Sequence, residues 1–209
     1  MINSLQMKRL LLPLLAALAL PTVVNANVDP EVHKLCLSAA DYLGCVKAMS
    51  TKSIDKLKTA KYYFERAMKK VKDGDHSSAI SDFNKVIDSK QISKGNLASA
   101  YFNRGQSRMN LNNYSEALSD YNKAILINPT NSNYYYTRGF AKNSLKDYNG
   151  AISDYSKAID VNPSYDTAYF MRGLNKYMVK DTVGSCSDVR TAFRLGLQEA
   201  KKFVGYYCD

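Results

Sequence analysis

The chain repeats itself every 34 residues, and this period restricts its possible folds more than any other feature. The motif Tyr-x-x-Arg-Gly occupies residues 101–105, 135–139 and 169–173, and residues 63–67 carry an earlier copy that ends in Ala. A unit of this length cannot bury its apolar face alone, so neighbouring units must stack to form a continuous core. The sequence therefore predicts an array of four stacked units.

Two helices joined by a turn account for each unit. Ala117, Tyr121 and Ala124 recur at spacings of three and four, which places them on one helical stripe. Asn128-Pro129 ends that helix, because the residue before a proline avoids the helical region. An Asp or Asn precedes each second helix, where an N-cap belongs. These residues are Asp75, Asn113, Asp147 and Asp181.

The recurring glycine indicates that the two helices of a unit approach closely. Glycine inside a helix costs up to about 1 kcal/mol relative to alanine, so its return in three units points to a packing requirement. Gly105 on the first helix and Ala117 on the second are the pair expected to meet.

The unit resembles the tetratricopeptide repeat, whose pattern is matched by Tyr101, Gly105, Ala117, Tyr121 and Pro129. The resemblance covers roughly residues 59–196 and is greatest to exported repeat proteins of cyanobacteria. It implies an all-α, right-handed superhelix of four helix-turn-helix units, at about 60–97, 98–131, 132–165 and 166–196. The first unit is longer than the second, which predicts a loop insertion at the first junction.

This chain departs from the family pattern where Arg replaces the usual Leu of the first helix. An Asp stands sixteen residues after each of these arginines. We predict an Arg-to-Asp bridge inside every unit, with a structural and not a catalytic role. The pairs are Arg66 with Asp82, Arg104 with Asp120, Arg138 with Asp154 and Arg172 with Asp188. The next aromatic of the pattern is also replaced by a cation, at Lys70, Arg108, Lys142 and Lys176.

The first 26 residues have the layout of a secretory signal peptide. Two cations precede an apolar run from Leu10 to Leu20, and small residues before Asn27 offer a cleavage site after Ala26. Pro13 interrupts the run, which is too short to cross a bilayer as a helix, so an uncleaved anchor is the less favoured interpretation. We expect an exported protein without a stable membrane span, delivered to a periplasm, a lumen or the medium.

Four cysteines remain after cleavage and would meet an oxidising compartment, where an even count is typical of disulfides. Three pairings are open. The local one, Cys36 with Cys45 and Cys186 with Cys208, is favoured because it joins cysteines that are near in sequence. The spacing of Cys36 and Cys45 fits neither a redox CxxC motif nor a zinc site with His33. No metal ion or other cofactor is predicted.

Both ends of the array should be capped, because an open solenoid end exposes core. Residues 27–58 are expected to form a short helical hairpin that holds Cys36 and Cys45. Residues 197–209 are expected to contain a capping helix from Leu197 to Tyr207, joined to the last unit through Cys208.

In the resembled family one face of each first helix lines a groove that holds a peptide or a partner helix. Here this face would carry an aromatic row flanked by further side chains. In a short superhelix the same rings could instead pack against neighbouring units, and the sequence does not decide between groove and core. The candidate groove residues are Phe64, Phe102, Asn103, Gln106, Tyr136, Thr137, Phe140, Phe170, Met171 and Leu174.

The favoured function is a non-enzymatic scaffold that binds a protein or peptide. The alternative is a self-associating structural protein, a homo-oligomer that buries the aromatic row in its own interface. Some family members clamp a C-terminal carboxylate, but of their clamp residues only Asn103 is matched here. An enzyme is disfavoured, since the chain has two histidines and no phosphate loop or nucleophile elbow. Nucleic-acid binding is disfavoured because the excess of cations is scattered along helix faces.

Overall fold

The computed structural model describes residues 36–37, 59–89 and 92–208. The expected signal peptide, the hairpin over 27–58 and Cys45 therefore lie outside the described residues, apart from Cys36 and Leu37. The pairing of Cys36 with Cys45 stays a prediction. Residues from Thr59 onward form one compact unit, and all that follows concerns this unit.

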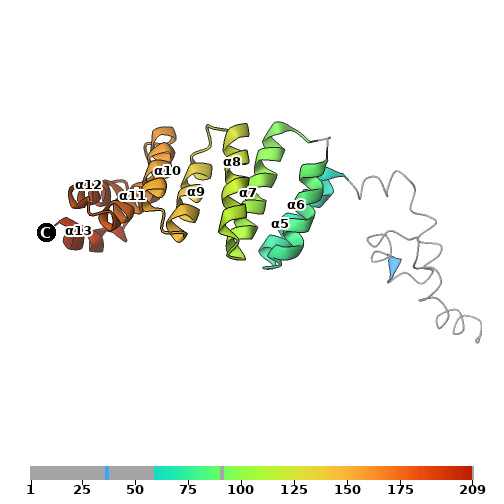
Figure 1. The fold of residues 1–209 in the computed structure, drawn as a ribbon, viewed down its shortest axis with the longest axis horizontal. Helices are drawn as coiled ribbons and strands as arrows, with labels where there is room; N and C mark the ends of the chain where they lie inside the picture. Colours follow the sequence, from blue (N-terminus) through green and yellow to red (C-terminus); the bar gives the residue numbers. More distant parts are fainter. Residues whose placement is uncertain (1–35, 38–58, 90–91, 209) are drawn as a thin grey trace, which may run out of the picture. The chain divides into compact units, whose positions relative to one another are not determined.

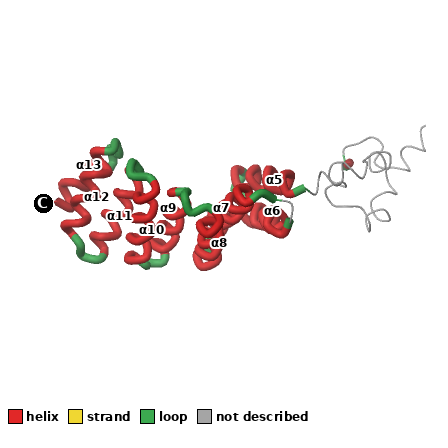
Figure 2. Tube along the Cα trace, turned by 90° about the horizontal axis from the view of Figure 1, so that it is seen from above, coloured by secondary structure: helices red, strands yellow, loops and turns green. Residues whose placement is uncertain are grey.

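Helices and short loops make up the whole of the described chain from Thr59 to Cys208, without a strand (Figures 1 and 2). Each helix packs mainly against its neighbours in sequence, so the helix pairs follow one another in chain order. The helices are α5 (Ala60–Lys72), α6 (His76–Asp88), α7 (Lys94–Asn110), α8 (Tyr114–Ile127), α9 (Ser132–Ser144), α10 (Tyr148–Val161), α11 (Asp166–Met178), α12 (Thr182–Arg194) and α13 (Ala200–Cys208). The expectation of an all-α superhelix of stacked helix pairs is confirmed. Within the described residues, no helix combines the length and the apolar character needed to cross a membrane.

The second helices begin and end where the sequence indicates. Asp75, Asn113, Asp147 and Asp181 are the N-caps of α6, α8, α10 and α12, and all but Asn113 accept a bond from a backbone N–H of the first turn. Asn128 and Asn162, each followed by a proline, are the C-caps of α8 and α10.

The turn inside each unit places one residue in the left-handed region directly before the N-cap. Gly74 holds this position in the first unit at φ 78°, whereas Lys146 and Lys180 hold it in the last two at φ 62° and 67°. The N–H of the following Asp147 reaches back to the carbonyl of Lys142 at 2.9 Å, which closes the end of α9. The turn geometry is thus kept even where a β-carbon makes it costly.

The extra residues of the first junction form helix instead of the expected loop. α7 has 17 residues, whereas α9 and α11 have 13 each. Ser93 caps the added turn by accepting a bond from the N–H of Asn96, so the longer helix starts on a regular N-cap.

The capping helix begins later than predicted, at Ala200 instead of Leu197. The N–H of Gly196 bonds to the carbonyl of Phe193 and that of Leu197 to the carbonyl of Ala192, which is the Schellman pattern that ends a helix. Gly196 has the positive φ, 115°, that this pattern needs. The residues expected to open the cap are therefore used to close α12.

Within each pair the helices approach as closely as the glycine pattern implies. A β-carbon added at Gly105 would lie 2.7 Å from the fully buried ring of Tyr121, and one at Gly139 would lie 3.0 Å from the ring of Tyr155. The core between the pairs is built from such aromatic rings and from small residues such as Ala117.

We expect Gly105→Ala to lower the free energy of unfolding by about 1–2 kcal/mol. Overpacking against Tyr121 costs about 1–3 kcal/mol, which outweighs a gain of up to about 1 kcal/mol in helix propensity. Gly95→Ala on the same helix is the matched control, since no atom of the described residues, apart from its chain neighbours and its own helix backbone, lies within 4 Å of the new β-carbon. Urea unfolding followed by circular dichroism measures both, and equal effects of the two substitutions would contradict the close approach.

We expect Lys146→Gly to raise the free energy of unfolding by up to about 1 kcal/mol, because glycine adopts the left-handed conformation without the steric cost of a β-carbon. The reverse change at the equivalent position, Gly74→Lys, should lower stability by a similar amount. Thermal unfolding of the two variants tests this, and a loss of stability in Lys146→Gly would show that the lysine side chain is needed at the turn.

Candidate functional site

A buried aspartate on the second helix of every unit binds the arginine of the first helix through both carboxylate oxygens. In the second unit Arg104 Nε donates to Asp120 Oδ2 at 2.9 Å and Nη2 to Oδ1 at 2.6 Å. The same two-bond pairs join Arg66 to Asp82, Arg138 to Asp154 and Arg172 to Asp188. The expected Arg-to-Asp bridge is thus present in all four units.

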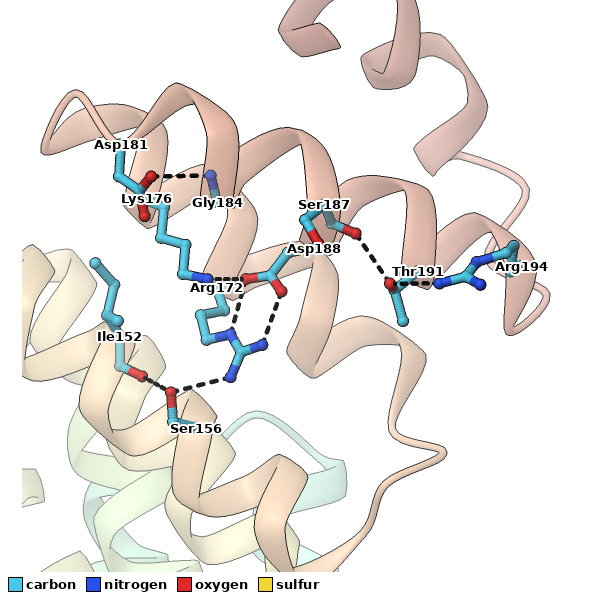
Figure 3. Close-up of polar contacts among 10 residues, drawn as sticks. All are labelled: Ile152, Ser156, Arg172, Lys176, Asp181, Gly184, Ser187, Asp188, Thr191 and Arg194. Atoms are coloured by element: carbon cyan, nitrogen blue, oxygen red, sulfur yellow. Dashed lines mark hydrogen bonds and ion pairs between the residues drawn. The ribbon is translucent and has the colours of Figure 1, made fainter.

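Each aspartate also binds a second cation, which the sequence analysis missed. The side chain one turn after the arginine reaches the same carboxylate, as Lys176 does on Asp188 at 2.9 Å (Figure 3). Lys70, Arg108 and Lys142 do so in the other units, at 2.6 to 2.9 Å. The signal was the cation in place of the family's aromatic residue.

In the last three units the arginine has a third bond, which crosses to the preceding unit. Arg172 Nη1 donates to the hydroxyl of Ser156 at 3.1 Å (Figure 3). Arg138 Nη1 donates to Asn122 Oδ1 at 2.7 Å. Arg104 Nη1 donates to Asn84 in the same way. One guanidinium therefore ties together three helices of two units, which suits the planar, five-donor shape of arginine.

In the first unit, Arg66 and Lys70 favour the ionised form of the buried Asp82 carboxylate. Asp82 is 1% exposed, and this burial by itself would raise its pKa. Hydrogen bonds from Arg66 and Lys70 outweigh the burial, so that the pKa of Asp82 lies below its ordinary 3.8.

The aromatic row expected in the groove packs mainly inside the chain. Phe102 is only 8% exposed, and its ring centroid lies 5.8 Å from that of Tyr121 and 4.7 Å from that of Tyr134 on the next first helix. Phe64, Tyr136 and Phe170 are half-buried and contact Phe83, Tyr155 and Phe203 respectively. The structure therefore corrects the groove assignment: Phe102 belongs to the core, and the other three rings are largely used for packing within the chain.

Three other predicted groove residues do meet, in a pocket of about 380 Å³ between α7 and α9. They are Gln106, Thr137 and Phe140, and Phe140 is 44% exposed. The α7–α9 pocket, as we call it, is completed by Met109, Asn110, Tyr114, Tyr121 and Ser144, which the sequence analysis had not assigned. Burial raises the pKa of Tyr121, whose hydroxyl has no hydrogen-bond partner among the described residues.

The remaining candidates lie outside this pocket. Asn103 Nδ2 donates to the carbonyl of Ser99 at 2.8 Å, so its amide is used within α7. Met171 and Leu174 are half-buried on α11. His76 starts α6 as Tyr114 starts α8, so it holds an ordinary place in the repeat. Across residues 59–89 and 92–208, no three His, Cys, Asp or Glu side chains gather as a metal site.

We expect stability to fall in acid through the buried Asp82. Because the pKa of Asp82 is lower in the folded chain than the ordinary 3.8, its contribution is complete above that value and is lost as the pH falls through the folded pKa. Asp82→Asn should lower the free energy of unfolding by about 3 kcal/mol at pH 7 and weaken the further loss in acid. Asp88→Asn, at the exposed end of α6, is the control. Urea titrations from pH 7 to pH 2 that give parallel curves for Asp82→Asn and the parent would contradict this.

Comparisons with known proteins agree with this architecture. Family models described as the tetratricopeptide repeat match residues 98–131 and 132–165. A search of curated proteins finds no match to the sequence. Solved structures of similar fold include MamA 41-end from Desulfovibrio magneticus RS-1, with a TM-score of 0.65 at 18% identity over 77% of this chain and 85% of that one.

Another similar structure is the first TPR of Spaghetti (RPAP3) bound to the HSP90 peptide SRMEEVD, with a TM-score of 0.53 at 23% identity over 57% of this chain and 96% of that one. The Arabidopsis OM64 TPR domain has the same TM-score of 0.53 at 23% identity, over 55% of this chain and 97% of that one. At these sequence identities the similar structures support the fold alone, whereas the two matched repeats support the family. With two repeats matched and the same helix pair continued on both sides of them, this chain belongs to the tetratricopeptide repeat family.

Proposed function

We propose that this chain is a non-enzymatic scaffold that binds an extended segment of a partner protein outside the cytoplasm, with the α7–α9 pocket as its binding site. The observation that carries the proposal is the meeting of Gln106, Thr137 and Phe140, residues from two neighbouring first helices, around one open space of about 380 Å³.

The pocket offers both kinds of contact that peptide recognition needs. Phe140 supplies an exposed aromatic face for an apolar side chain. Among the described residues, the side chains of Gln106 and Thr137 make no hydrogen bond within the chain and are left to bind a peptide backbone. By contrast, Asn110 and Ser144 already donate to carbonyls of their own helices.

The similar structure of the first TPR of Spaghetti, bound to an HSP90 peptide, supports the idea that this fold can hold a peptide. The mode of binding is expected to differ. A clamp for a C-terminal carboxylate needs Lys, Arg and Asn side chains, but those positions carry Phe64, Met68, Asn133 and Thr137, and the amide of Asn103 is bonded to Ser99. An internal segment with an apolar side chain suits the α7–α9 pocket better.

Two features support action outside the cytoplasm. The first 26 residues have the layout of a signal peptide. The disulfide between Cys186 and Cys208 is of a kind that persists in oxidising compartments and is rare in the cytosol.

Self-association is the second candidate function. Less of the aromatic row than expected is exposed to support it. The row was expected to fill an interface between copies, but its rings contact partners such as Tyr121, Tyr165 and Phe203 within the chain. An interface between copies would need other apolar surface.

Affinity capture from envelope and secreted fractions tests the proposed site. The oxidised protein should retain a partner that Phe140→Ser loses, with at least about a tenfold fall in affinity, because an exposed aromatic anchor is of the residue type that dominates binding. Leu126→Ser is the matched control, since Leu126 is 84% exposed on α8 and does not line the pocket.

Circular dichroism should show both variants folded. Phe102→Ala is unsuitable as a probe of binding, because removing a core ring is expected to cost about 3–5 kcal/mol of stability. Equal retention of the partner by Phe140→Ser would reject the α7–α9 pocket. Concentration-dependent oligomers in light scattering that Phe140→Ser disrupts would favour the self-association candidate.

A further inference from the structure

A second and larger pocket, of about 1040 Å³, lies at the C-terminal end of the array between α12 and α13. Its walls are joined by the disulfide between Cys186 on α12 and Cys208 on α13. Basic and apolar side chains line it together, among them Arg190, Arg194, Val183 and Tyr206. We call it the α12–α13 pocket. It shares no lining residue with the α7–α9 pocket.

The two arginines of this pocket differ from the other arginines of the described chain. Arg66, Arg104, Arg108, Arg138 and Arg172 each bind an aspartate. Arg190 and Arg194 are exposed one turn apart on α12, and neither is in ion-pair distance of a carboxylate of the described residues. Arg194 donates only to the Thr191 hydroxyl, at 3.0 Å. Among residues 59–89 and 92–208, no acidic side chain lines the pocket to compensate its charge.

Arg190 stands at a position of the repeat where the earlier units carry a hydrogen-bond acceptor. Asn84, Asn122 and Ser156 stand at the equivalent position of the earlier units, where each accepts a hydrogen bond from the arginine of the next unit. In the last unit the acceptor is replaced by a donor, Arg190. α13, which has no arginine, packs on α12 here in the place of a following unit, so no arginine of a next unit comes to Arg190. A carboxylate would be attracted instead.

Apolar surface beside the arginines completes the site. Val183 is 82% exposed and Tyr206 is 70% exposed, and the Tyr206 ring is held by edge contact with Tyr207 at a centroid distance of 5.0 Å. Tyr and Arg are the side chains that most often dominate protein interfaces. We propose that the α12–α13 pocket binds an acidic segment of a partner protein, with carboxylates paired to Arg190 and Arg194 and an apolar side chain against Val183 and Tyr206.

The disulfide makes this site dependent on oxidation. α13 has nine residues, which is too short for a helix to be stable by itself, and it is held to the array by the Cys186–Cys208 bond and by packing such as Phe203 on Phe170. Reduction should therefore loosen one wall of the pocket and weaken binding of the acidic segment.

Selection from a randomised peptide library displayed on phage tests the proposal, with the oxidised protein as bait. We expect the selected peptides to be rich in Asp and Glu around an apolar residue. Their affinity should fall about tenfold or more in Arg190→Gln/Arg194→Gln, since two charge pairs are lost. It should fall on addition of reductant as well. Lys201→Gln/Lys202→Gln is the matched control, because it removes two exposed cations of α13 that do not line the pocket.

Several outcomes would overturn the proposal. These are selected peptides without acidic enrichment, unchanged binding in the arginine variant, and an equal loss in the lysine control, which would reveal a response to net charge alone. A concentration-dependent dimer that the arginine variant disrupts would assign the face to a second copy. If the selected acidic peptides lose affinity for Phe140→Ser and keep it for the arginine variant, their site is the α7–α9 pocket. Failure of this proposal and failure of the proposed function are therefore distinguishable.

Discussion

The buried aspartate of each second helix is the interaction on which the array depends. Asp120, fully buried, gathers both Arg104 and Arg108 from the facing helix, so that two cations and one anion share a small, poorly hydrated volume. Burying a charge is costly unless it is paired and hydrogen-bonded, and here both oxygens are satisfied. The ion pair of Arg104 with Asp120 fixes the angle and register of one helix against the other. Apolar rings such as Tyr121 are buried between the helices, and this burial of apolar surface stabilises their packing.

What the sequence could predict followed from spacings within one unit. The spacing in sequence between Arg104 and Asp120 recurs between the equivalent Arg and Asp of every unit, so the bridge was predictable. The bond from Arg104 to Asn84 was missed because it crosses a junction, where the added turn of α7 changes the spacing from sixteen to twenty residues. The second cation was missed because a lysine or arginine on a helix face is usually solvated, and only the structure brings it to the carboxylate.

The groove was harder to predict, because the same helix face serves both core and surface. Phe102 and Phe140 both lie on the predicted face, yet Phe102 is covered by Tyr134 of the next unit while Phe140 is left open. Which ring is covered depends on aromatic residues of the adjoining unit that do not follow the repeat pattern. A single unit read by itself therefore cannot separate a binding anchor from a packing residue.

The hydrogen bond from the arginine to the preceding unit also affects how the number of units in such a chain can change. Every inner unit carries both halves of the junction, a donor for the unit before it and an acceptor for the unit after it, as Arg138 and Ser156 show. Duplication or loss of one whole inner unit would therefore restore matched junctions without any compensating substitution. Arg190 breaks this rule at the last unit, so growth by duplication is confined to the interior of the array and its C-terminal face stays fixed.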